Sequence, residues 1–206
     1  MTVFSSRCSK SSAERLNPWL AMAMACLVAL LLVLPRPSAG QGRPTLEFIY
    51  TEVVPSESQY VVNAAVTMSA NPRVEELVNA GVAVPFVAEF VLTRSRWYWF
   101  DESIVERVMD FRLSYHALTR QYRLTVGSLH RSFDSYDEAL SAMLSIRNWA
   151  VVDRSRLRGG ESYDAALRFR LDLSQLPKPF QVAALGSRDL DLSTGWTNWT
   201  FLAASR

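Results

Sequence analysis

The chain has 206 residues, of which 49% are hydrophobic and 20% are charged, and this balance excludes a disordered or low-complexity protein. Four of the 22 basic residues but only one of the 20 acidic residues lie in the first 40 positions, so the remaining chain carries one more acid than base. A near-neutral body offers no excess positive charge for phosphates, and we expect no nucleic-acid binding. The length suits one domain, and the different composition of the first 40 residues divides the chain into a leader over 1–40 and a single globular domain over 41–206.

The leader has a basic start, an uninterrupted apolar run over 19–34 and small residues over 38–40. This order is typical of a secretory signal peptide. The run is 16 residues long, between the about 7–15 of a signal peptide and the about 20 of a bilayer-spanning helix. A cleaved signal peptide and a retained membrane anchor both stay open, and both predict export. Cys8 and Cys26 lie in the leader, so we expect no disulfide in the body.

The first half of the body predicts two strands, a helix and a third strand. Segment 46–54 predicts a strand that stops at Pro55, alternating apolar residues over 60–68 predict a second strand, and the pair indicates a hairpin. Asn71 as N-cap, the following proline and a glycine at 81 predict a short helix between them. Strict alternation over 82–92 then predicts a long strand with one buried face.

The second half continues with hairpins around a second helix. Segments 107–115 and 122–126 alternate on either side of a turn. Ser135 and Glu138 form a capping box that starts a helix, for which Asn148 is a C-cap candidate. The remaining predicted elements are a strand over 149–152, a strand over 163–173, a rigid corner over 176–180 and a last short strand at 196–199. Links this short favour antiparallel pairing, so we expect a strand-dominated α+β fold: a mostly antiparallel β-sandwich-like domain with two interposed helices.

Three stretches of the body resemble one known family. They are FRLSYHALTRQYR at 111–123, LPKPFQ at 176–181 and DLSTGW at 191–196. Together they are similar to the domain of unknown function 4390 family of exported proteobacterial proteins, over about Leu46 to Phe201. The resemblance implies a periplasmic or membrane-anchored envelope protein and points to a membrane sensor as a partner. It implies no activity and no functional residues.

The candidate binding residues centre on an arginine and aromatic run. Arg94, Arg96, Trp97, Tyr98 and Trp99 combine the residue types that are enriched at protein, glycan and membrane interfaces. A core strand with large side chains is the simpler interpretation of the same run. We add His116 and Lys178, the one lysine of the body, which lies in the 176–180 corner.

The sequence gives little support for a catalytic site or a metal site. His116 would need a nucleophile and an acid nearby, and Ser114 and Asp110 share its strand face, at spacings too long for a hydrogen-bonded row. Two distant histidines and a body without cysteine predict no metal site. We also expect no cofactor.

Three functional hypotheses follow. The first is a non-enzymatic module that binds an envelope or inner-membrane protein. The second is a carrier or sensor of an apolar ligand, lined by Phe86, Phe90, Phe111 and Phe169. The third, ranked last, is a hydrolase that uses His116 or a carboxylate pair.

Overall fold

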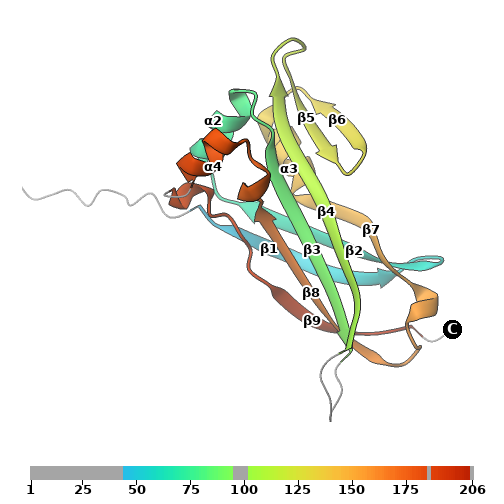
Figure 1. The fold of residues 1–206 in the computed structure, drawn as a ribbon. Helices are drawn as coiled ribbons and strands as arrows, with labels where there is room; N and C mark the ends of the chain where they lie inside the picture. Colours follow the sequence, from blue (N-terminus) through green and yellow to red (C-terminus); the bar gives the residue numbers. More distant parts are fainter. Residues whose placement is uncertain (1–43, 95–101, 185–186, 205–206) are drawn as a thin grey trace, which may run out of the picture. The chain divides into compact units, whose positions relative to one another are not determined.

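The computed structural model describes residues 44–94, 102–184 and 187–204, all within one compact unit, residues 42–206. These residues form two antiparallel sheets whose strands cross obliquely (Figure 1). The smaller sheet has the order β1-β2-β7, with strands β1 (Leu46–Pro55), β2 (Gln59–Met68) and β7 (Ser145–Asp153). Strand β7 therefore comes from the second half of the chain and forms one edge of this sheet.

The larger sheet has six strands in the order β6-β5-β4-β3-β8-β9. They are β3 (Val84–Arg94), β4 (Glu102–His116), β5 (Gln121–Val126), β6 (Leu129–Phe133), β8 (Ser162–Leu171) and β9 (Thr197–Leu202). Every pairing in both sheets is antiparallel. Short links allow this arrangement, because antiparallel neighbours need only a turn between them.

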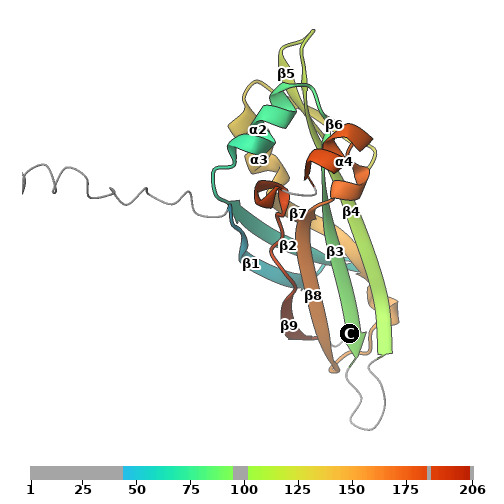
Figure 2. The same ribbon diagram turned by 60° about the vertical axis from the view of Figure 1, so that its left-hand side comes forward.

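Three α-helices lie near one end of the large sheet: α2 (Pro72–Asn79), α3 (Tyr136–Met143) and α4 (Lys178–Ala184) (Figure 2). Both predicted helix starts are confirmed. The Asn71 side chain accepts hydrogen bonds from two backbone N–H groups of α2, and Ser135 Oγ accepts one from the Glu138 N–H. Single 3₁₀ turns occupy Arg154–Arg156, Leu173–Gln175 and Arg188–Leu190.

The core lies between the sheets, as the alternation predicts. On β3, Phe86, Ala88, Phe90 and Leu92 are all fully buried. The Phe169 ring of β8 stacks on Phe86 with centroids 5.6 Å apart, and Phe90 meets Trp149 of β7 at 6.2 Å. Stacked and edge-on rings at these separations are favourable, so aromatic contacts join the sheets at their centre.

The strand-dominated, sandwich-like α+β fold is confirmed, and two local predictions are wrong. Helix α3 ends at Met143, so Asn148 lies within strand β7 rather than at a helix end. The corner at 176–180 runs into helix α4. Segment 129–133, for which we predicted no strand, pairs with β5 as the edge strand β6.

Candidate functional site

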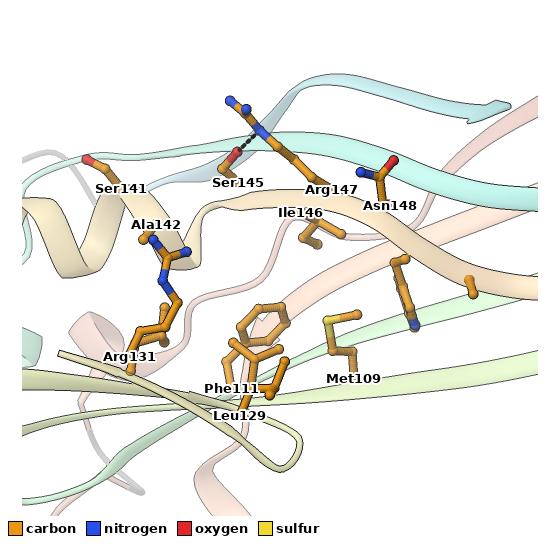
Figure 3. Close-up of a pocket in the computed structure, with 14 residues that line it drawn as sticks. Met109, Phe111, Leu129, Arg131, Ser141, Ala142, Ser145, Ile146, Arg147 and Asn148 are labelled. Carbon is orange, nitrogen blue, oxygen red and sulfur yellow. Dashed lines mark hydrogen bonds between the residues drawn. The ribbon is translucent and has the colours of Figure 1, made fainter. Parts of the chain in front are cut away.

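An open pocket of about 770 Å³ lies where the larger sheet extends beyond the smaller one. The larger sheet has six strands and the smaller has three, so the inner faces of β4, β5 and β6 exceed what the smaller sheet can cover. Helix α3 covers part of the inner face that the smaller sheet leaves uncovered, and it contacts β4, β5 and β6. The pocket is the remainder, between the β4–β6 surface, the end of α3 and strand β7 (Figure 3).

The floor of the pocket is apolar because the strands alternate. Met109 and Phe111 come from β4, Leu124 and Val126 from β5, and Leu129 from β6. Residues opposite one another across antiparallel strands share a face. Phe111 lies opposite Val126, and Val126 opposite Leu129, so one register brings these side chains together. Leu129 is 72% exposed, which leaves a large apolar side chain open to solvent.

Strand β7 supplies the opposite wall through six consecutive residues, Ser145 to Ala150. Its pairing with β2 shifts register between Val62 and Ala64, which indicates a bulge at this point. Asn148 lies in the bulge with φ +52°, a left-handed conformation that asparagine tolerates better than most residues. Its N–H donates to Asn63 Oδ1 at 2.9 Å, so a side chain of the neighbouring strand holds the bulge.

Two arginines are the charged side chains of the pocket lining. Arg131 of β6 places its guanidinium 5.1 Å from the Phe133 ring centroid, and Arg147 of β7 donates from Nε to Ser145 Oγ at 3.1 Å. In Figure 3 Arg131 reaches from the floor toward Ala142 of α3, whereas Arg147 lies with Ser145 on the side of β7 away from the floor. Within the described residues neither arginine forms an ion pair, and the lining contains no carboxylate.

Next to the pocket, tyrosines pack between α3 and the part of the large sheet that this helix covers. Tyr122 of β5 lies 5.0 Å from the Tyr115 ring and 6.0 Å from the Tyr136 ring, and it donates to Asn79 of α2 at 2.8 Å. Burial, reinforced by Glu75 and Asp137, raises the pKa of Tyr136 to about 12. Tyr136 therefore stays neutral at physiological pH.

The predicted binding residues do not gather at this pocket. Arg94, at the end of β3, forms ion pairs with Glu102 at 2.5 Å and with Glu161 at 3.2 Å. Lys178 begins α4 and is exposed. Arg96, Trp97, Tyr98 and Trp99 lie outside the described residues, so the role expected for this run stays a prediction.

The hydrolase candidates are not assembled into a catalytic arrangement in the described structure. His116 ends β4 and is half-buried, with Nδ1 3.4 Å from Thr119 Oγ1. The other histidine, His130, has Nδ1 3.0 Å from Thr125 Oγ1. Asp110 instead accepts a hydrogen bond from Gln175 Nε2 at 3.4 Å.

The phenylalanines expected to line a ligand cavity divide into two groups. Phe111 lies in the pocket floor. Phe86, Phe90 and Phe169 are completely buried in the core and are absent from the pocket lining, so their predicted placement is wrong. Sequence reasoning missed Arg131, Arg147 and Leu129. The one available signal was the alternation of Leu129, Arg131 and Phe133, which places an arginine on an apolar face.

Two further structural findings concern other kinds of site. Across 44–94, 102–184 and 187–204, no group of three or more His, Cys, Asp or Glu side chains is placed to hold a metal ion. In the same part of the chain no helix has the length and apolarity needed to cross a membrane. The apolar run expected as signal or anchor, 19–34, lies outside the described residues.

The fold and site define a two-sheet antiparallel protein with an open, arginine-lined apolar pocket. A family model described as domain of unknown function (DUF4390) matches residues 43–200. The match covers most of the chain, so the protein belongs to this family and the resemblance is confirmed. No curated protein matches the chain, and no solved structure matches it.

Proposed function

We propose that this protein is a non-enzymatic binding protein of the cell envelope whose pocket carries or senses an apolar ligand. The observation that supports the proposal is the apolar floor of a pocket of about 770 Å³. Small-molecule sites generally have volumes of about 300–1,000 Å³ and mostly apolar linings with a few polar groups. Met109, Phe111, Leu124 and Leu129 with two arginines fit that description.

Export belongs to the same proposal. The apolar run 19–34, with basic residues before it, would direct the body across the inner membrane. The pocket would then operate in the periplasm, free or anchored beside the membrane. N-terminal sequencing of the protein from fractionated cells tests this step. A mature start near 40 supports a cleaved signal, a retained start in the membrane fraction supports an anchor, and a cytoplasmic protein contradicts export.

Ligand binding is tested with a variant in which a larger side chain on α3 blocks the pocket. Ala142 lines the pocket and is half-buried, so Ala142→Trp fills the space without removing a core side chain. We expect this variant to lose the small molecule that native mass spectrometry finds on protein purified from its own cells. It should also lose displaceable binding of a fluorescent acyl probe.

Glu138→Trp is the matched control, because Glu138 lies on the same helix, is exposed and does not line the pocket. It should bind as the unchanged protein does. A protein that carries no small molecule and takes up no acyl probe would contradict the proposal. So would equal binding by the two tryptophan variants.

The interaction-module hypothesis is the second candidate, and the free edge of β7 favours it. Among the described strands β7 pairs only with β2, and its residues 145–150 border the pocket. An edge strand can pair with an extended peptide of a partner while apolar side chains enter the groove beside it. Crosslinking the full-length protein in its native cells tests this. One dominant envelope partner, lost on Ala142→Trp, would favour it over a small ligand.

A further inference from the structure

We infer that the ligand is a single-chain amphiphile with an anionic head group, held by Arg131 at the mouth of the pocket. This inference rests on the proposed function and adds the chemical class of ligand. An apolar floor alone would accept any apolar molecule. The distribution of charge over the lining narrows the chemical class of the ligand.

The first step is the sign of the charge. Arg131 lies on the face of the β5–β6 hairpin that forms the floor, and the described lining contributes no carboxylate to balance it. By contrast, Arg168 and Arg170 are paired with Glu89. An unpaired guanidinium beside an open apolar pocket attracts an anion, because it can donate charge-assisted hydrogen bonds to it.

The second step is the donor groups that remain free. Arg131 stacks its guanidinium over Phe133. Stacking leaves the N–H edge of Arg131 open. A carboxylate, sulfate or phosphate head group could accept hydrogen bonds from this edge.

The third step is polarity along the pocket. Figure 3 places the Arg131 guanidinium beside Ala142 of α3 and Met109 toward the other end. Phe111, Leu124 and Leu129 form the floor. A molecule with its charge beside α3 and one apolar chain along this floor would satisfy both parts. A polar sugar would leave the floor without an apolar partner, and a neutral hydrocarbon would leave Arg131 without an anionic partner.

The experiment compares three ligands with the same apolar chain: dodecanoate, monolauroylglycerol and dodecyltrimethylammonium. Their dissociation constants for the full-length protein are measured by calorimetry below the micelle concentration. We expect dodecanoate to bind about tenfold more tightly than the neutral ligand, and the cation to bind weakest. Raising the salt concentration should weaken dodecanoate binding alone, because salt screens charge pairs.

The arginine variants test the position of the head group. Arg131→Gln should weaken dodecanoate binding about fivefold to tenfold and leave monolauroylglycerol binding unchanged. Arg123→Gln is the matched control. Arg123 is exposed on β5 of the same hairpin, but it does not line the pocket. It should change neither ligand.

The outcomes separate the two levels of the proposal. If none of the three ligands binds, the proposed function fails. If dodecanoate and monolauroylglycerol bind equally, the function stands and the anionic head group is overturned. The inference is also overturned if the anion binds more tightly but Arg131→Gln does not affect it, or if Arg131→Gln weakens the two ligands alike.

Discussion

The inner face of the large sheet has a closed half and an open half. Over β3 and β8 the smaller sheet lies directly on the face, and Phe86, Phe90 and Phe169 have no exposed surface. Over β4, β5 and β6 the face is only partly covered by α3, and Leu129 remains 72% exposed. Both halves have the same alternation of apolar residues, but only the closed half buries all of them.

The difference teaches that the pocket results from unequal sheets rather than from a gap in the core. An exposed apolar side chain forgoes about 1.5–3 kcal/mol of burial free energy, so the open half contributes less to folding than its composition would allow. The arginines divide in the same way. Glu89 pairs with Arg168 and Arg170 behind the closed half, whereas Arg131 and Arg147 beside the open half have no acidic partner in the described structure.

The largest expected effect separates the two halves by stability. Phe169→Ala should lower the free energy of unfolding by about 3–5 kcal/mol, because the fully buried ring contacts both Phe86 and Phe111. Met109→Ala, in the partly exposed floor, should cost about 1 kcal/mol. Denaturant unfolding of the purified variants measures both values. Equal losses would mean that the floor is packed in solution and the pocket closed.

Most of the closed half could be predicted from sequence, whereas the open half could not. The alternation of β3 and β8 fixes which side chains face inward, since the period of a strand is two residues. The pocket depends on sheet order: β7 joins β2, and β6 extends the other sheet. Pairing between distant segments leaves no periodic signal. Helix α3 also ends four residues before Arg147, so a helix that reached the predicted C-cap Asn148 placed that arginine on the wrong element.

The ion pairs behind the closed half should give the next largest effect. Glu89 accepts from Arg168 Nε at 2.6 Å and from Arg170 Nη2 at 3.0 Å. Glu89→Gln should lower the free energy of unfolding by about 2 kcal/mol at neutral pH, because it removes the charge from both bonds. Glu76→Gln is the control. Its ion pair with Arg73 is exposed, so the loss should be about 0.5 kcal/mol or less.

The same carboxylate predicts a pH dependence. Burial raises the pKa of Glu89, but the hydrogen bonds and charges of Arg170 and Arg168 outweigh burial and lower it below its ordinary value of 4.5. A lowered pKa in the folded state adds stability that is complete above pH 4.5 and is lost as the pH falls through the folded value. The stability difference between Glu89→Gln and the unchanged protein should therefore shrink as the medium becomes more acidic than pH 4.5. A constant difference down to pH 2 would contradict this role of the ion pairs.

Substitutions in strand β7, the wall of the open half, should change stability less, and they allow a more specific control. Asn148 has φ +52°, so Asn148→Val should cost about 1 kcal/mol of stability, and Asn148→Gly should be nearly neutral. Arg120 has φ +54° in the β4–β5 turn and does not line the pocket. Arg120→Val should cost the same stability, but only Asn148→Val should also weaken acyl-probe binding. Equal probe binding by the two valine variants would show that the bulge does not shape the pocket.

The smallest expected effect concerns the tyrosine that joins α3 to the open half. Tyr136 Oη is buried without a hydrogen-bond partner in the described structure, and its ring packs edge-on against Tyr122. An unpaired buried hydroxyl adds no stability, so Tyr136→Phe should leave the free energy of unfolding unchanged or raise it by up to about 0.5 kcal/mol. Tyr122→Phe, which removes the 2.8 Å bond to Asn79, should instead lower it by about 1 kcal/mol. A loss on Tyr136→Phe as large as that on Tyr122→Phe would mean that a polar contact holds α3. No loss means that the packing of this ring, together with the buried Ala139 and Met143 of α3, holds the helix without a hydrogen bond of this tyrosine.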